Sequence, residues 1–196
     1  MKSSYLRAGA ALACALALSA CGGGDGDLYI AGSFAGVTKP GLVLQNNGGS
    51  DLPIDPTSVG TGQFMFPDLV ETDSSYNITV KTPPSNAEKC DVLNGSGKMA
   101  FSISNVYVNC TIRQHELKGT VTGLTGNNLV LVNGSDRVAV PAGATSFAMA
   151  KVNEDAPYGI IILTQPDNQT CTVANGTGTV GPNDITNVSV TCGPRT

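Results

Sequence analysis

Cysteine is the residue type with the clearest capacity for chemistry in this chain, because its positions follow a repeated pattern. The string C-D-V-L-N-G-S-G at residues 90–97 returns as C-T-V-A-N-G-T-G at residues 171–178. A second string, N-V-Y-V-N-C at residues 105–110, returns as N-V-S-V-T-C at residues 187–192. Four of the six cysteines lie in this frame, where thiols can pair as disulfides or bind a metal such as zinc.

The N-terminus has the layout of an export signal, which bears on the redox state of those thiols. A short basic start precedes an apolar run at residues 8–17, which is too short to span a bilayer. The string L-S-A-C follows at residues 18–21 and resembles the lipobox of bacterial lipoprotein signal peptides. The resemblance implies that residues 1–20 are a signal peptide and that Cys21, as the new N-terminus, is acylated on its thiol and amine.

An ordinary secretory signal that contains a cysteine, or a short buried helix, would be the alternative interpretations. Residue types, spacing and position together favour the lipoprotein signal. In the same class Gly22 is unlike an inner-membrane retention signal, so the resemblance implies the outer membrane of a diderm bacterium. The N-terminal acyl chains would then hold the protein on that membrane.

Residues 21–27 favour a flexible tether over a calcium-binding Gly/Asp repeat, because only one imperfect copy is present.

The remaining cysteines are expected to form two disulfides. Cys14 leaves with the signal and Cys21 carries lipid, which leaves four thiols in an oxidising compartment. Four cysteines allow three pairings, and the repeat favours one of them. Cys90–Cys110 and Cys171–Cys192 lie at equivalent places in the two copies and have nearly equal separations in the sequence. A four-thiol metal site is disfavoured, since no C-x-x-C spacing occurs.

The repeat extends beyond the cysteines and divides the chain into residues 28–111 and residues 116–193. Glycines and aromatic residues match between the copies, in the pairs Gly32 and Gly119, Gly36 and Gly123, Phe64 and Phe147, and Tyr76 and Tyr158. Each copy is near the lower size limit of a β-sandwich. The two tyrosines begin apolar stretches, and a place in the core is favoured over a role in ligand binding.

Short alternating apolar runs separated by turn residues predict an all-β protein without helices after the signal. Asn-Gly pairs favour tight hairpin turns. We expect two tandem immunoglobulin-like β-sandwich domains, with an additional strand in the first at residues 98–104 and Val188, Val190 and Cys192 facing inward. In the second copy the predicted strands are residues 117–122, 128–133, 136–140, 145–149, 158–164, 170–174 and 186–192.

Residues 28–193 also resemble a module of bacterial surface lipoproteins and larger exported proteins. The shared pattern is G-L-V-L-x-N-N-G at residues 41–48, Y-x-I-T-V at residues 76–80, and the cysteine strings. The second copy departs from the first string, with Asn128 in place of the glycine. The resemblance implies the fold, and it implies no activity and no catalytic residue.

A search for catalytic, cofactor or metal-binding residues finds none that the sequence supports. His115, the only histidine, lies in the polar joint between the copies and is expected to be solvated, and no G-x-S-x-G string accompanies it.

Carboxylate pairs occur at Asp25 and Asp27, at Asp51 and Asp55, and at Glu154 and Asp155. Paired acids can hydrolyse glycosides, but loop solubility is the plainer interpretation. A net charge of −4 without a basic patch argues against nucleic acid.

The sequence therefore predicts a membrane-anchored envelope lipoprotein that acts as a non-enzymatic structural or binding module, with an envelope protein or glycan as partner. A small carboxylate-dependent hydrolase or sugar-active domain is the alternative. Recognition is expected where the copies differ, at residues 48–62, 98–104 and 152–157.

Overall fold

In the computed structural model, which describes residues 28–195, each repeat consists of two four-stranded sheets. The strands of repeat one are β1 (Ile30–Ala35), β2 (Val43–Asn46), β3 (Gly49–Pro53), β4 (Gly62–Met65), β5 (Ser75–Thr82), β6 (Ala87–Leu93), β7 (Ser96–Lys98) and β8 (Ile103–Ile112). Those of repeat two are β10 (Leu117–Thr122), β11 (Leu129–Asn133), β12 (Asp136–Val140), β13 (Ser146–Ala148), β15 (Pro157–Thr164), β16 (Gln169–Ala174), β17 (Thr177–Thr179) and β18 (Ile185–Pro194). Two short strands, β9 (Gln114–His115) and β14 (Val152–Asn153), pair where the repeats meet.

The two repeats have the same strand order, so the sequence repeat is also a repeat of structure. Repeat one has sheets β4-β1-β8-β6 and β3-β2-β5-β7, and repeat two has sheets β13-β10-β18-β16 and β12-β11-β15-β17. The first and last strands of each repeat run parallel, and the other neighbours are antiparallel. The predicted fold class, all-β with two tandem β-sandwiches, is confirmed.

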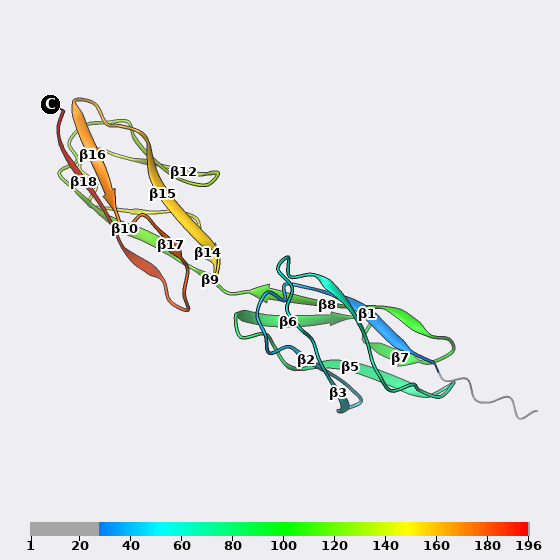
Figure 1. Cartoon of the computed structure of the whole chain (residues 1–196). Helices are drawn as coiled ribbons and strands as arrows, with labels where there is room; N and C mark the ends of the chain where they lie inside the picture. Colours follow the sequence, from blue (N-terminus) through cyan, green and yellow to red (C-terminus); the bar gives the residue numbers. More distant parts are fainter. Residues whose placement is uncertain (1–27, 196) are drawn as a thin grey trace, which may run out of the picture.

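The sandwiches lie end to end (Figure 1). The chain enters repeat one at the end farthest from repeat two, and it finishes at the opposite tip of repeat two (Figure 1). The predicted signal peptide, Cys21 and the tether lie outside the described residues. Within residues 28–195, no helix is long and apolar enough to cross a membrane.

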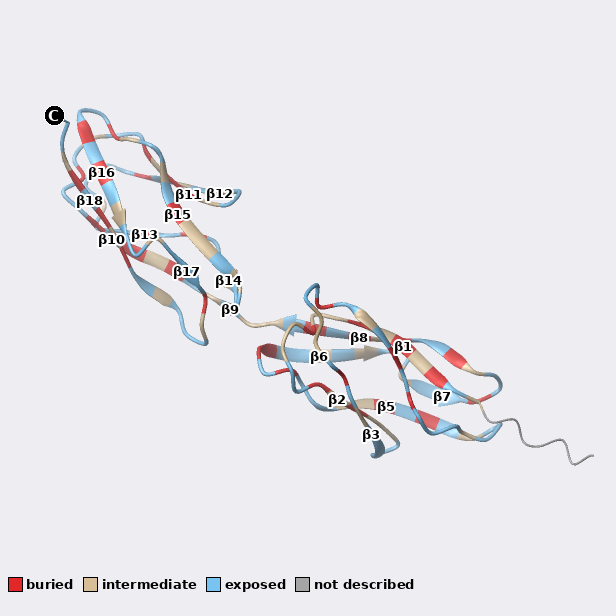
Figure 2. Cartoon of the chain, viewed as in Figure 1, coloured by how far each residue is buried: buried red, intermediate tan, exposed pale blue. Residues whose placement is uncertain are grey.

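Each repeat has its own apolar core between its two sheets (Figure 2). One cluster contains buried residues from Ile30 to Cys110, and the other contains buried residues from Leu117 to Cys192. In β18 the predicted alternation is confirmed, because Val188, Val190 and Cys192 are buried while Thr191 is exposed. Burial on one face of each strand is what drives the two sheets together.

The disulfides join neighbouring strands of one sheet at the inner face. Cys90 lies directly opposite Cys110 and is bonded to it, and Cys171 is bonded in the same way to Cys192. The Cα–Cα distance is 3.9 Å in both bridges. This is the pairing that the repeat indicates, and both bridges pack against the cores.

Some strand predictions were wrong in ways that have a common cause. Residues 98–104 do not form an additional strand, because β7 ends at Lys98 and β8 begins at Ile103. Repeat two has β17 as the equivalent of β7, so the two copies match in structure here. Strands β9, β14 and β17 were missed because two or three residues are too few to show an alternating pattern.

The repeated N-G-x-G string carries the chain from one sheet to the other. Asn94 and Asn175 adopt left-handed backbone conformations, with φ of 55° and 56°. Their Nδ2 atoms donate hydrogen bonds to the carbonyls of Asn105 (3.1 Å) and Asn187 (3.0 Å) at the start of the last strand. The flanking strands β6 and β7 lie in different sheets, so the expected tight hairpin was wrong, whereas a structural role is confirmed.

The positions of the two tyrosines explain why the repeated N-G-x-G string ends in glycine. A Cβ atom at Gly97 would lie 3.0 Å from the ring of Tyr76, and one at Gly178 would lie 2.9 Å from the ring of Tyr158. Tyr76 is buried, and Tyr158 packs against the second core. Both tyrosines are therefore core residues, as the sequence predicts.

Candidate functional site

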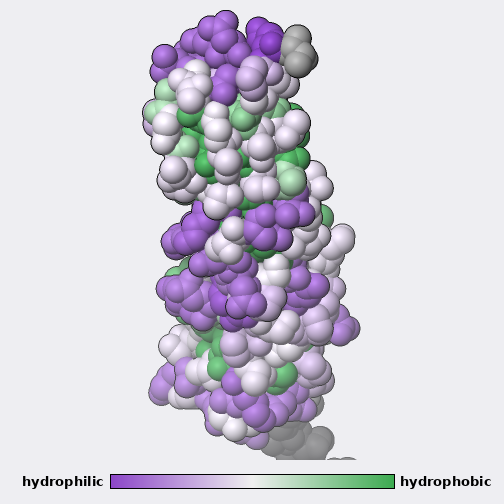
Figure 3. Space-filling view, turned by 90° about the vertical axis from the view of Figure 1, so that its left-hand side faces the viewer, coloured by the Kyte–Doolittle hydropathy of each residue, from purple (hydrophilic) through white to green (hydrophobic). Residues whose placement is uncertain are grey.

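The end of repeat one holds repeat two through a polar joint. Strand β9 pairs with β14, which places Val152 opposite His115 and Asn153 opposite Gln114. Gln114 Nε2 donates a hydrogen bond to Asn153 Oδ1 at 3.0 Å. Hydrophilic residues gather around the level where the repeats meet (Figure 3). The joint is therefore built from hydrogen bonds and ion pairs rather than from apolar burial.

Arg113 contacts both repeats at once. Its Nε donates to Glu154 Oε2 at 2.9 Å, while its Nη1 donates to the carbonyl of Ala87 at 2.9 Å and its Nη2 to the carbonyl of Ser85. Its backbone N–H donates to the Asn86 carbonyl (3.0 Å), and its carbonyl accepts from the Glu154 N–H (2.8 Å). A planar guanidinium suits this role, because its fixed donors can bind several acceptors simultaneously.

Asp155 makes the second contact of the joint. Its Oδ1 lies 3.2 Å from Lys39 Nζ, and its Oδ2 accepts a hydrogen bond from Asn86 Nδ2 at 3.1 Å. The Asn86 Nδ2 group also donates to Thr38 Oγ1 at 3.0 Å. Asn86 is only 1% exposed, because repeat two covers it. We call the set Thr38, Lys39, Ser85, Asn86 and Arg113 the receiving face of repeat one.

His115 is not the solvated linker residue that the sequence suggests. Its side chain is 12% exposed and lies between two carboxylates, with Nε2 at 3.3 Å from Glu154 and Nδ1 at 3.7 Å from Asp184. The short pairing of β9 with β14 turns this residue toward repeat two, and a two-residue strand leaves no signal in the sequence. The histidine is a structural part of the joint.

One of the expected recognition segments lies inside the joint. Residues 152–157 contain β14, Glu154 and Asp155, and these groups are bound by Arg113 and Lys39. A segment whose charges are already paired within the chain is poorly placed to bind a partner. The two copies differ in this segment because only repeat two is bound at this end by another repeat.

The charge of Glu154 leads us to expect that the joint is sensitive to acid. The hydrogen bond from Arg113 lowers the pKa of the Glu154 carboxyl, partial burial opposes this shift, and His115 adds to it. A lowered folded-state pKa gives stability that is present above the unfolded pKa of about 4.3 and is lost as the pH falls through the folded value. We therefore expect the joint to loosen below about pH 4 while both sandwiches stay folded.

Small-angle scattering of the mature chain between about pH 6 and about pH 3 tests this expectation. The maximum dimension should become more variable at low pH, and circular dichroism should report intact β structure. Glu154→Gln should loosen the joint at neutral pH and make its response to acid smaller, with the Lys39–Asp155 pair still present. An identical pH response in wild type and Glu154→Gln would contradict the assignment.

The far end of repeat two carries a second copy of the receiving face. In the repeat frame Arg195 corresponds to Arg113, and Asn168 corresponds to Asn86. The backbone contact between them is also repeated, because the Arg195 N–H donates to the Asn168 carbonyl at 3.1 Å, as Arg113 does to Asn86 at 3.0 Å. We call Thr125, Gly126, Asp167, Asn168 and Arg195 the distal face.

The two copies differ in what covers them. Asn168, Thr125 and Arg195 are exposed, whereas Asn86 is buried beneath repeat two. A hollow of about 450 Å³ at the distal face is lined in part by residues of that face, among them Thr125, Asp167 and Asn168. Another hollow, of about 370 Å³, lies in repeat one. Among residues 28–195, no other segment covers the distal face as repeat two covers the receiving face.

The two faces are not identical in charge. Gly126 stands where repeat one has Lys39, and Asp167 stands where repeat one has Ser85. The Asp167 carboxylate accepts hydrogen bonds from Asn128 Nδ2 at 3.0 and 3.2 Å. Arg195 is consequently the one cation among the five residues of the distal face.

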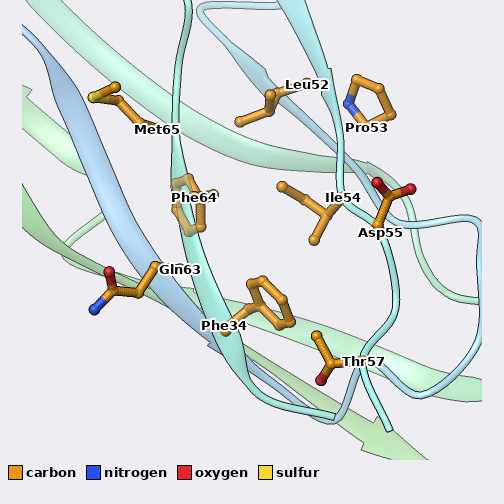
Figure 4. Close-up of a pocket in the computed structure, with 10 residues that line it drawn as sticks. Phe34, Leu52, Pro53, Ile54, Asp55, Thr57, Gln63, Phe64 and Met65 are labelled. Atoms are coloured by element: carbon orange, nitrogen blue, oxygen red, sulfur yellow. The ribbon is translucent and has the colours of Figure 1, made fainter.

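The expected recognition segment at residues 48–62 borders the hollow in repeat one (Figure 4). Phe34, Ile54 and Phe64 converge between the strands, while Asp55 and Gln63 lie at its rim (Figure 4). Its floor is nearly closed, since these three apolar side chains are buried. The hollow is a shallow opening at the edge of the core, with a single carboxylate.

Other hollows are features of the fold. One lies at Gly32 and Phe64 in repeat one, and its counterpart lies at the equivalent Gly119 and Phe147 in repeat two. A feature present in both copies follows from the shared architecture, because equivalent residues line it in each.

Within the described part of the chain, the carboxylate pairs that the sequence suggests are not assembled for catalysis. Asp51 pairs with Lys81, Glu154 and Asp155 belong to the joint, and Asp55 stands alone at the first hollow. Among residues 28–195, no cluster of three or more His, Cys, Asp or Glu side chains has the arrangement of a metal site. Asp25 and Asp27 lie outside the described residues.

No protein-family model matches this sequence, and no curated protein matches it significantly. Among solved structures, the chain is similar to the major pilin protein T-13 of Streptococcus pyogenes, with 11% identity, a TM-score of 0.36, and 87% of this chain and 98% of that chain covered. It is also similar to a C-terminal fragment of the pilus adhesin SpaC from Lactobacillus rhamnosus GG, with 10% identity, a TM-score of 0.44, and coverage of 86% and 98%. Two B repeat units of the collagen-binding protein of Staphylococcus aureus align with 13% identity, a TM-score of 0.31, and coverage of 86% and 50%. Likenesses this low carry no conclusion about what the chain binds.

Proposed function

We propose that this chain is a membrane-tethered, non-enzymatic spacer of a bacterial envelope, which presents the distal face of repeat two to a protein partner. The observation that carries the proposal is the copied face: the groups that hold a neighbouring domain in repeat one are exposed at Arg195 and Asn168. A face that already binds a protein turn inside the chain is suited to bind a similar turn from outside.

The arrangement of the two ends supports a spacer. The chain enters at one pole of the molecule, and the distal face lies at the other (Figure 1). With Cys21 acylated, as the sequence predicts, the distal face would stand the length of two sandwiches from the lipid surface. The joint resists bending, because Arg113 and Asp155 make several directional contacts between the repeats.

The partner can be sought by site-specific photo-crosslinking in living cells. A photoreactive residue in place of Asn168 should yield an adduct with an envelope protein, whereas one in place of Ser135 should not, because that exposed hairpin lies outside the distal face. Arg195→Glu should reduce the Asn168 adduct several-fold, since it reverses the only cation of the face. Equal adducts at both positions, or none at Asn168, would contradict the proposal.

The anchor is tested separately in the same cells. Cys21→Ser should abolish labelling by a fatty-acid probe and release the protein from the membrane fraction. Retention of the variant on the membrane would argue against the lipid tether while leaving the distal face open to the crosslinking test.

A further inference from the structure

The end of repeat one where the chain enters exposes three large apolar side chains. Tyr29 is 42% exposed, Leu69 is 52% exposed and Phe101 is 68% exposed. Exposed apolar residues that gather at one place mark contact surfaces more often than isolated ones do. We call these three residues the entry patch.

The backbone holds the three segments of the entry patch together. Leu28 and Val70 exchange two hydrogen bonds of 2.9 Å, which places Leu69 beside the entering chain. The Tyr29 N–H donates to Ser102 Oγ at 3.2 Å, and the Tyr29 carbonyl accepts from the Ile103 N–H at 2.9 Å. Phe101 precedes Ser102, so its loop borders Tyr29 as well.

Repeat two shows that the fold does not require apolar residues here. The pairing of Leu28 with Val70 corresponds to that of His115 with Val152, so Glu116 stands in the place of Tyr29 and Lys151 in the place of Leu69. Both charged residues are exposed. The same two positions are thus charged where the chain enters from another sandwich and apolar where it enters from the tether.

We propose that the entry patch rests on the lipid surface to which the chain is tethered. The inference rests on the proposed function, because it takes Cys21 as the anchor. Residues 22–27 can extend at most about 25 Å between Cys21 and Leu28, so this pole stays near the head groups. Tyrosine and other large apolar side chains are stabilised at that interface.

Charge indicates which lipid surface fits. Asp68, Glu71 and Asp73 are exposed in the loop that carries Leu69, and Lys98, three residues before Phe101 in the chain, is an exposed cation. The excess of negative charge would be repelled by anionic head groups. The entry patch is therefore suited to a zwitterionic surface.

The absence of tryptophan from the sequence allows a direct measurement. Phe101→Trp gives a single reporter at the entry patch, and Val59→Trp gives a matched reporter at a side chain that is 75% exposed and lies near the receiving face. Both variants would be prepared as full mature acylated chains and reconstituted into phosphatidylcholine vesicles that contain brominated lipid, which quenches nearby tryptophan.

We expect strong quenching and a blue-shifted emission for Phe101→Trp and little of either for Val59→Trp. Adding Tyr29→Ser and Leu69→Ser to Phe101→Trp should reduce the quenching several-fold, with circular dichroism confirming the fold. Replacing half of the lipid with phosphatidylglycerol at low salt should also reduce it, and an increase would contradict the choice of a neutral surface. Equal quenching at both reporters in vesicle-bound protein overturns the inference and leaves the proposed function intact, whereas protein that carries no acyl group overturns both.

Discussion

Replacing Gly36 by alanine should destabilise repeat one by about 3 kcal/mol or more, whereas the same change at Gly48 should cost about 1 kcal/mol. Both glycines have φ of +77°, so the cost of a left-handed alanine is common to the two. A Cβ at Gly36 would also stand 1.9 Å from the Cys110 carbonyl oxygen, and one at Gly48 would have no atom within 4 Å. The difference between the two losses of stability therefore measures the cost of placing a Cβ atom against the backbone beside the disulfide.

Urea unfolding followed by far-ultraviolet circular dichroism of the two variants checks this difference. Gly123→Ala provides a second comparison, because its Cβ would lie 2.4 Å from the Cys192 carbonyl oxygen in the equivalent place of repeat two. Equal destabilisation by Gly36→Ala and Gly48→Ala would mean that the close approach to the disulfide strand has no energetic role.

These contacts also explain why so much of the fold was predictable from the repeat. Matching glycines at Gly32 and Gly119 leave room for the carbonyls of Val106 and Val188, which a Cβ would approach within 2.2 and 2.3 Å. Such positions tolerate no side chain, so both copies keep a glycine there. The alternation in β18 was readable for a similar reason, because one face of a strand must be apolar to be buried.

The joint could not be predicted in the same way. Arg113, Glu154 and Asp155 are polar residues in short connections, and nothing in their spacing distinguishes a solvated linker from an ion-paired contact. Strands as short as β9 and β14 have no visible period. One signal was present in the sequence: Arg113 and Arg195 both stand three residues after the last cysteine of their copy, and Asn86 and Asn168 stand four and three residues before the first.

Because the two repeats have separate cores, loss of one disulfide should have a large effect on the stability of one repeat only. Replacing Cys171 and Cys192 together by alanine should lower the stability of repeat two by about 3 kcal/mol, as expected for a closed loop of about twenty residues. Repeat one should change by less than about 0.5 kcal/mol, because distant sites without shared partners act independently. The two apolar clusters share no residue, and the contacts at the joint are polar.

Two transitions in calorimetry would reveal this difference, since only the one that belongs to repeat two should move. The double replacement of Cys90 and Cys110 is the matched control, because it opens the equivalent bridge and should shift the other transition instead. If either double variant shifts both transitions equally, the joint must couple the repeats far more strongly than surface ion pairs do. Independent transitions would instead mean that Arg113 and Asp155 orient two domains that each fold by their own core, which is what a spacer requires.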